Sequence, residues 1–218
     1  MATNLSNFNP TDIRNFGGFF NSTGIHTANK YEISVVAREP VTSAWSNLGI
    51  TPNVIDDTFN YTLVNLTIPN GAISTTPVRS YGEAIEMPYG KTYDTANLTH
   101  YLDNNGAIHS LYTTWMNCVF DPNTRTLGYY NDYVATIYIK LYRRIRIGDK
   151  VGRFTYKNEP FVLVTLHDAY PKAINPFSMQ GLSGNAPTQF DVNITCRRIT
   201  ADYNPATIKN ANQNGKKS

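Results

Sequence analysis

The stretch FVLVTLHDAYPKAI, residues 161–174, carries the strongest fold signal in the sequence. Its first six residues are apolar or β-branched, which is typical of a buried strand. Pro171 donates no backbone N–H and pushes Tyr170 toward extended geometry, so the sequence predicts that the strand ends at this Tyr-Pro step. A second strand with clean alternation follows in TQFDVNITCRRI, residues 188–199. We therefore expect two strands joined by a bent connection that contains the proline.

Strand patterns also occur at residues 30–38, 59–68, 97–103 and 134–147. The last of these, VATIYIKLYRRIRI, spans ~45 Å if fully extended, so we expect it to bend or to carry a bulge. Its alternation places Lys140, Arg144 and Arg146 on one face and isoleucines on the other. Residues 72–95 are punctuated by prolines and glycines and are expected to be extended.

One helix is predicted, over residues 107–119. Ile108, Leu111, Trp115 and Val119 recur at spacings of 3, 4 and 4 residues, so they form a single apolar stripe along it. Leu111 and Trp115 are therefore the expected anchors of this helix in the core. An Asp-Asn-Asn sequence just before the helix offers side chains that can cap its first turn.

The order of these elements, strands then one helix then strands, favours a mainly β fold. We expect two packed antiparallel sheets that form a small barrel-like or sandwich domain with one α-helix against it. A single domain over residues 1–201 is expected to include an irregular N-terminal arm at 1–29 and an extended loop at 39–58. Residues 202–218 are polar and predicted to be a flexible tail.

Composition and charge argue against several classes of function. The formal net charge is +3, and the tail beyond Ala201 supplies +2 of it through three lysines and one aspartate. The remaining +1 is a weak electrostatic footprint for a nucleic-acid binder. No apolar leader opens the chain and no run of ~18 apolar residues occurs, so no membrane segment is expected. Cys118 and Cys196 are expected to be free, buried thiols of a protein in a reducing compartment.

Patterns that carry catalytic chemistry are weak. The four histidines are scattered without the spacing of a metal site, so neither a metal nor another cofactor is expected. His167-Asp168 is the best acid–base candidate, although a strand-end pair that satisfies local backbone groups explains it more simply. Glu83 and Glu86 could form a carboxylate pair, but no pocket signal accompanies them. The sequence indicates a protein that is not an enzyme.

Basic residues gather between positions 140 and 157 and alternate with aromatic residues. Such a pattern can hold phosphates and stack bases, which makes a single-stranded nucleic-acid-binding β-barrel protein an alternative function. The simpler interpretation is a solvated strand face, or a face that pairs with acidic residues of another subunit, because the rest of the chain balances this charge. Salt-dependent binding of nucleic acid by the isolated protein would distinguish the two.

From Leu66 onward, the order of the motifs resembles the tail-tube proteins of contractile-tailed, T4-like bacteriophages. The segments that carry this resemblance are TIPNGAISTTPVRSYG (67–82), EMPYGKTYD (86–94), LDNNGAIHSLYTTWMN (102–117), GYYNDYVATIYI (128–139), AYPKAI (169–174) and FDVNITCRR (190–198). Each motif alone is loose, whereas their shared order is specific. Segment 39–58 is longer than the corresponding link in the family, and the tail after Ala201 has no counterpart there.

The resemblance implies a structural protein of the virion tail. Six subunits would close a ring, rings would stack into a tube, and DNA would pass through the channel without specific binding. The implied partners are copies of the same chain, the tail sheath and the baseplate, and the implied place of assembly is the host bacterial cytoplasm. The two departures from the family leave open a tube-initiating or tube-terminating protein of the baseplate or neck.

Segments that bury little surface within one domain are expected at contacts between subunits or rings. The candidate contact residues are Phe16, Phe19 and Phe20 in the arm, with Pro77, Arg79, Tyr81, Glu83 and Glu86 in the extended segment. The expected outer or inter-subunit basic face consists of Lys140, Arg143, Arg144 and Arg146. Fixed cations lining a DNA channel would slow the passage of DNA, so this face is predicted to point away from the channel.

Overall fold

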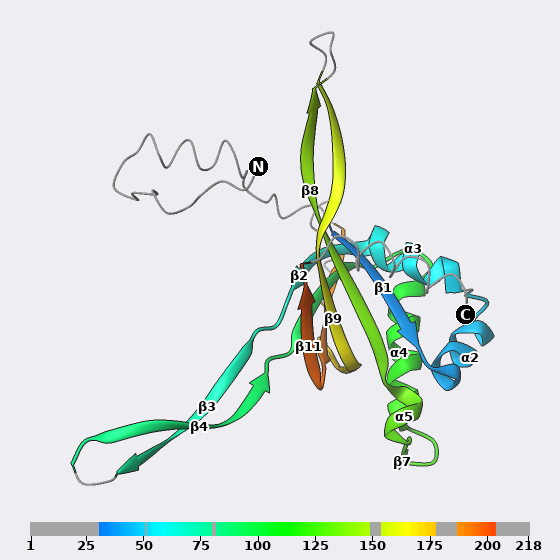
Figure 1. Cartoon of the computed structure of the whole chain (residues 1–218). Coiled ribbons are helices and arrows are strands. Elements are labelled where there is room, and N and C mark those ends of the chain that lie inside the picture. The colour runs from blue at the N-terminus through cyan, green and yellow to red at the C-terminus, as the bar shows by residue number, and fades with distance from the viewer. Residues whose placement is uncertain (1–30, 51, 80–81, 149–153, 178–186, 204–218) are drawn as a thin grey trace. The chain divides into compact units, whose positions relative to one another are not determined.

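A computed structural model of the chain describes residues 31–50, 52–79, 82–148, 154–177 and 187–203 (Figure 1). The elements, in chain order, are β1 (Tyr31–Ala37), α2 (Glu39–Asn47), α3 (Pro52–Thr62), β2 (Leu63–Thr67), β3 (Gly71–Arg79), β4 (Ala84–Tyr93), β5 (Ala96–Tyr101), α4 (Ala107–Val119), β6 (Phe120–Asp121), β7 (Thr126–Leu127), α5 (Tyr130–Tyr133), β8 (Ala135–Gly148), β9 (Phe154–Ile174), β10 (Gln189–Thr195) and β11 (Arg198–Asp202). The chain divides into two compact units, Glu32–Leu141 with Pro160–Ser218, and Met1–Tyr31 with Tyr142–Glu159. All of the described helices belong to the first unit.

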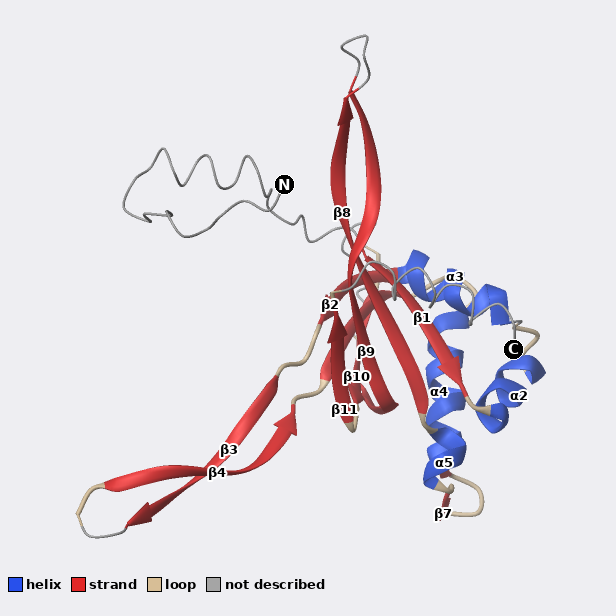
Figure 2. Cartoon of the chain, in the orientation of Figure 1, coloured by secondary structure: helices blue, strands red, loops and turns tan. Residues whose placement is uncertain are grey.

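Strands dominate the structure, which confirms the predicted mainly β fold (Figure 2). One sheet has seven strands in the order β1-β8-β9-β10-β5-β2, with β11 also paired to β9. Two further sheets, β3-β4 and β6-β7, are two-stranded and antiparallel. Among the described residues the large sheet stays open and does not close on itself, so the barrel-like arrangement is corrected to an open sheet covered by helices.

The expectation that a strand ends at Tyr170-Pro171 is wrong, because β9 continues to Ile174. Up to His167 this strand pairs with β11, and from Tyr170 it pairs with β10 instead. Between the two partners Asp168 adopts a φ of 50°, and the β10 register shifts opposite Pro171. Proline is tolerated in strands at such irregularities, since a missing N–H costs little where the ladder is already interrupted. The Tyr-Pro step therefore marks a change of partner within one strand.

The segment 39–58, predicted to be a loop, folds instead into α2 and most of α3. The described residues therefore contain four helices where one was expected. Its prolines belong to the first turns of these helices, where a missing N–H has no intrahelical partner to lose. Val41 and Trp45 are the buried side of α2, and Ile55 and Phe59 are buried on α3. Burial of these four side chains supplies the tertiary stabilisation that short helices need.

The predicted helix at 107–119 is confirmed as α4, and it forms the centre of the helical layer. The Asp103 carboxylate accepts hydrogen bonds from the N–H groups of Ala107 (3.0 Å) and Ile108 (3.3 Å), which caps the first turn. Leu111 and Trp115 are fully buried, as expected of core anchors. Trp115 packs edge-on against Trp45 with ring centroids 5.5 Å apart, and the Trp45 indole N–H donates to the Leu111 carbonyl. This contact joins α2 to α4.

A buried histidine joins the helical layer to the sheet. The side chain of His100, on β5, is fully buried, and its two ring nitrogens lie 2.9 Å from the Thr62 hydroxyl and from the Tyr112 hydroxyl. The Thr62 hydroxyl already donates to the Thr58 carbonyl, so Nδ1 of His100 donates to Thr62 and Nε2 accepts from Tyr112. Burial lowers the pKa of His100 to about 4, so the ring is neutral in the folded protein at neutral pH.

Candidate assembly surfaces

Strands β3 and β4 form a hairpin that pairs only with itself among the described residues. The register runs from Gly71 opposite Tyr93 to Arg79 opposite Ala84, with a shift between Ser74 and Thr75. Nearly every residue of the hairpin is exposed. A two-stranded hairpin is at best marginally stable in water, so this element needs further contacts to be held firmly.

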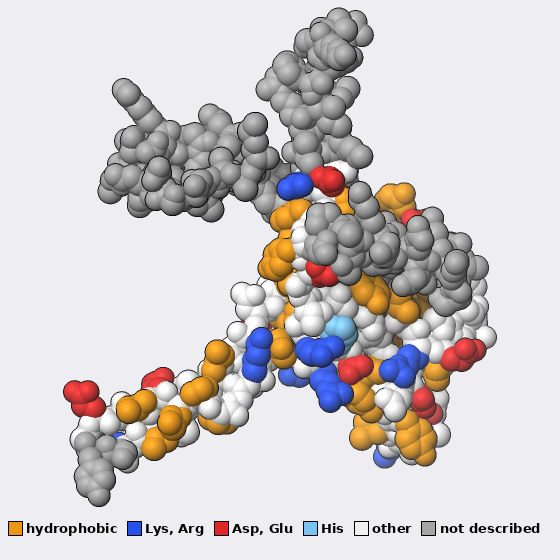
Figure 3. Space-filling model, in the orientation of Figure 1, with side chains coloured by type: hydrophobic (Ala, Val, Ile, Leu, Met, Phe, Trp, Pro, Cys, Tyr) orange, Lys and Arg blue, Asp and Glu red, His pale blue; other side chains and the backbone are white. Residues whose placement is uncertain are grey.

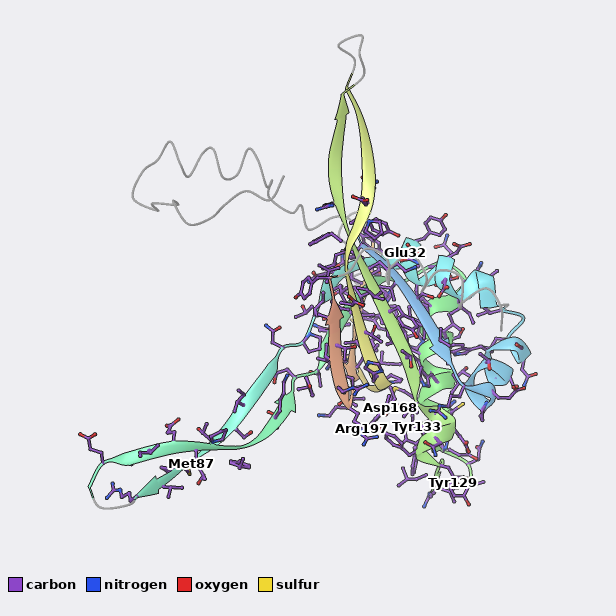
Figure 4. All side chains as sticks on the ribbon, in the orientation of Figure 1. Glu32, Met87, Tyr129, Tyr133, Asp168 and Arg197 are labelled. Atoms are coloured by element: carbon purple, nitrogen blue, oxygen red, sulfur yellow. The ribbon has the colours of Figure 1, made fainter. Side chains whose placement is uncertain are left out.

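The two faces of the hairpin differ in chemistry near its tip. Directly opposite residues share a face, so Val78, Ile85 and Met87 lie together on one of them. These side chains are 42%, 64% and 54% exposed, respectively. Figure 3 shows apolar side chains along the hairpin, and Figure 4 labels Met87 on it. We refer to Val78, Ile85 and Met87 as the apolar hairpin face.

The opposite face of the hairpin, which we call the polar face, is mixed, because it holds polar side chains among Pro77, Ala84 and Pro88. It carries Thr75, Arg79 and Glu86, and the Thr75 hydroxyl donates to the Glu86 carboxylate at 3.0 Å. Soluble monomers rarely leave a contiguous apolar surface uncovered, and such a surface rimmed by polar residues typically marks an interaction site. The amphipathic hairpin therefore has the features of a contact element whose partner covers one side.

Four of the predicted contact residues lie on or beside this hairpin and are exposed, namely Pro77, Arg79, Glu83 and Glu86. Pro77 and Glu86 are directly opposite each other, on the polar face. Tyr81, Phe16, Phe19 and Phe20 lie outside the described residues. Sequence reasoning did not single out the apolar hairpin face, although the alternation in TTPVR and AIEM contains the signal.

The predicted basic face is not a uniform exposed surface, because Lys140 is buried. Its side chain is 7% exposed, and its ammonium lies 3.4 Å from the Glu32 carboxylate on β1. Arg143, in the other unit, is exposed and pairs with Glu159 at 3.1 Å. The side chains of Arg144 and Arg146 lie outside the described residues. Both described members of the group thus pair with acidic residues of the same chain.

His167 and Asp168 do not form an acid–base pair. The His167 Nε2 lies 2.8 Å from the Thr200 hydroxyl, whereas Asp168 pairs with Arg197 at 3.6 Å (Figure 4). Partial burial and the nearby Arg198 lower the pKa of His167, and the Asp168 charge opposes this only in part. Each side chain of the pair makes a local contact, His167 with Thr200 on β11 and Asp168 with Arg197 just before β11, as the simpler interpretation expects.

Other candidate chemistry is absent from the part of the chain that the structure describes. There, no three His, Cys, Asp or Glu side chains come together as a metal site. Cys118 and Cys196 are free and half-buried, and burial raises the pKa of both thiols. No helix within the described ranges has the length and apolar character needed to cross a membrane.

A second exposed apolar region lies on the segment that joins α4 to β8. Leu127 and Tyr129 are 77% and 83% exposed, and Phe120 and Tyr130 are also exposed. Arg125 adopts a φ of 56° in the β6-β7 turn, and the Gly128 N–H donates to the Val119 carbonyl. We refer to Phe120, Leu127, Tyr129 and Tyr130 as the tyrosine loop surface.

Comparisons with known proteins bear on the family and the fold of this chain. The family described as phage tail tube protein matches residues 26–202. Among solved structures, the chain is similar to a protein in the anti-feeding prophage baseplate, with 9% identity and a TM-score of 0.50 over 82% of this chain and 95% of that chain. It is similar to a protein in the PVC sheath/tube terminator of an extracellular contractile injection system, with 12% identity and a TM-score of 0.51 over 82% and 96%. An Hcp protein also matches, at 12% identity and a TM-score of 0.42 over 81% and 94%. The search of curated proteins finds no matching sequence.

Proposed function

From the premise that this chain belongs to the phage tail tube protein family, we propose that it builds stacked hexameric rings that form the channel for DNA delivery. The chain is a structural, tail-tube-type protein and not an enzyme, as its family membership implies. The hexamer, the stacking and the passage of DNA are the proposed part. The observation in this chain that supports the stacking is the exposed apolar hairpin face.

The chemistry of the hairpin supports stacking. Val78, Ile85 and Met87 form an exposed apolar surface on an element with few contacts of its own. If a second copy covers this face, apolar burial at roughly 25 cal/mol per Å² contributes to association. Stacking joins two different surfaces of the same chain, one from each of two neighbouring rings. Because such a contact leaves a free surface at each end of the stack, further rings can add along the axis and a tube results.

The lateral contact within a ring is the second part of the proposal. A ring also joins two different surfaces of the chain, but its rotation closes after a fixed number of copies. Six copies agree with the six-fold symmetry named for the baseplate that contains one similar protein. The remaining proposed partners are the tail sheath and the baseplate, and the place of assembly is the host bacterial cytoplasm.

The proposal also concerns the channel. DNA must pass without being held, so a lining with few fixed cations is expected. Lys140 is consistent with this expectation because it is buried beside Glu32. Arg143 is likewise paired, with Glu159. We therefore propose that DNA transits the lumen without specific binding.

Electron microscopy of the purified protein tests the assembly directly. Concentrated protein in negative stain is expected to show rings of six subunits and rods built from them. Single rings that never stack would indicate a tube-terminating relative in place of the main tube subunit. A protein that stays monomeric at high concentration would overturn the proposal.

Two matched hairpin variants test the stacking contact. Ile85→Thr with Met87→Thr makes the apolar hairpin face polar and keeps good strand formers. The control pair, Thr75→Val with Glu86→Gln, changes the polar face to a similar extent. Both proteins are expected to fold with unchanged melting temperatures, because the altered side chains are exposed. Only the first pair should lose rods, and rods of normal length from it would exclude this face as the stacking contact.

A further inference from the structure

The outer edge of β1 is occupied by side chains of α3. β1 is the end strand of the seven-stranded sheet, with β8 on its other side. The Ile33 N–H donates to the Asn60 side-chain oxygen at 2.7 Å, and the Asn60 amide N–H donates to the Ile33 carbonyl at 2.8 Å. An antiparallel partner residue would make the same two bonds with Ile33. The Asn60 amide thus takes the place of a neighbouring strand.

Asp56, one helical turn before Asn60, extends this cover along the same edge. Its carboxylate accepts from the Val35 N–H at 3.1 Å and from the Ser34 hydroxyl at 2.9 Å. The Asn60 amide also donates to the Asp56 carbonyl, which fixes its orientation on the helix. Residues four apart on a helix lie on one face, so α3 presents both side chains to β1 together.

The position of α3 is itself fixed by burial. Ile55 and Phe59 are buried and lie beside Asp56 and Asn60 in the sequence, and Phe59 packs edge-on against His100 and Tyr112. The cover of β1 is therefore held by the core and does not depend on an exposed loop. Exposed end strands invite pairing with another chain, and proteins often cover the edges that must not pair.

Among the described residues, β2 and β11 are the other strands of this sheet with a neighbour on only one side, and Asn65 and Thr67 on β2 are exposed. No side chain within the described ranges is bonded to the backbone of residues 64–67. We propose that α3 is an edge cap that closes β1 to strand addition by a second copy of this chain, so that backbone pairing between copies joins β2 of one copy to a strand other than β1 of the next. The closing of β1 stands independently of the proposed tube, whereas the use of β2 rests on it.

Removal of the cap tests the first part. Asp56→Ala with Asn60→Ala leaves the outward N–H groups of Ile33 and Val35 without partners, and Asp57→Ala on the exposed side of α3 is the control. Hydrogen exchange at Ile33 and Val35 is expected to rise by at least tenfold in the first protein only. Light scattering should then show new dimers or larger species. If hydrogen exchange at Ile33 and Val35 does not change, the proposal that α3 caps β1 is wrong. It is also wrong if exchange rises but the protein does not form new dimers or larger species.

A third substitution identifies the edge that pairs. Val35→Pro removes the outward N–H of β1, and proline is accepted on an edge strand where that group faces away from the ladder. Added to the double variant, it should abolish the new association, and persistence of the association would exclude β1 as its site. If the double variant fails to fold, the single variants Asp56→Ala and Asn60→Ala provide the same exchange measurement in a protein that keeps half of the cap.

Lysine substitutions on β2 and on β1 test the proposed use of β2 in pairing between copies. Asn65→Lys with Thr67→Lys on β2 is expected to prevent assembly, because charges on an open edge oppose strand pairing. Val36→Lys on β1 should leave assembly unchanged, since that edge is already covered. The proposed use of β2 would be wrong if the β2 variant still assembles. It would also be wrong if only the β1 variant loses assembly. A wild-type protein that does not assemble would refute the proposed tube and still leave the cap-removal experiment decisive for β1.

Discussion

The buried His100 makes the stability of this protein depend on pH in a way that can be calculated. Its pKa is about 4 in the folded protein, against an ordinary value of 6.5 in an unfolded chain. Between these two values the unfolded state binds more protons than the folded state. Stability is therefore fully present above pH 6.5 and is lost as the pH falls toward 4. The full effect is about 3 kcal/mol, of which about 2 kcal/mol is lost between about pH 7.5 and pH 5.

The physical reason lies in the hydrogen bonds of the ring. Nε2 of His100 accepts from the Tyr112 hydroxyl, and burial keeps the pKa of Tyr112 well above its usual range. A proton on Nε2 would turn the acceptor into a donor and leave the Tyr112 hydroxyl proton without a partner. It would also place a charge among Phe59, Phe190 and Tyr112, where desolvation is expensive.

Urea unfolding at the two pH values checks this prediction. His100→Gln removes the titrating group, and its packing cost is present at both pH values and cancels in the difference. The loss of stability from about pH 7.5 to pH 5 should be smaller in the variant by about 2 kcal/mol. Most carboxylates remain ionised at the lower pH, so they add little. Equal pH dependence in the two proteins would refute the reasoning, because His100 would then titrate alike in both states.

Three further outcomes are expected. Trp115→Ala should lower the free energy of unfolding by about 3–5 kcal/mol, because it empties a fully buried site. It also removes the 2.7 Å hydrogen bond from the Trp115 indole N–H to the Tyr133 carbonyl. An unshifted melting transition would contradict this prediction. Gly128→Ala should destabilise by about 1–3 kcal/mol because a methyl group there meets the rigid Cys118 carbonyl. Gly90→Ala, where the space is open, is its matched control and should melt like the wild type. Deletion of residues 1–28 should leave a folded protein that no longer forms rods in negative stain, and rods of normal length would exclude the arm as a contact.

Sequence periodicity located the elements whose pattern is regular. The helix at 107–119 has the predicted bounds, and its stripe at Leu111 and Trp115 is buried. β1 and β5 lie where alternation placed them. These predictions succeed because a period of 3.6 or 2 residues fixes which side chains share a face, and the apolar face must be covered.

Two predictions that treat a proline as the end of regular structure are wrong. Pro40 and Pro52 suggest a loop when taken as breakers, yet both fall in the first turn of a helix. Helices form there because Trp45 and Phe59 find buried sites against α4 and β5, which no local pattern reveals. Pro171 suggests a strand end, yet β9 continues because it exchanges β11 for β10 at this point.

For the candidate assembly surfaces, too, some features follow from the sequence and others only from the tertiary structure. The sequence by itself predicted that residues 69–92 bury little surface within the domain, because prolines and glycines interrupt them, and the exposed strands β3 and β4 agree with this. Only the tertiary structure decided that Val78, Ile85 and Met87 share one face, since strand register sets which residues are opposite. It also decided that Lys140 is buried and that Asn60 covers β1, because both depend on partners more than 25 residues away along the chain. Local patterns fix the faces of an element, whereas long-range contacts decide what covers each face.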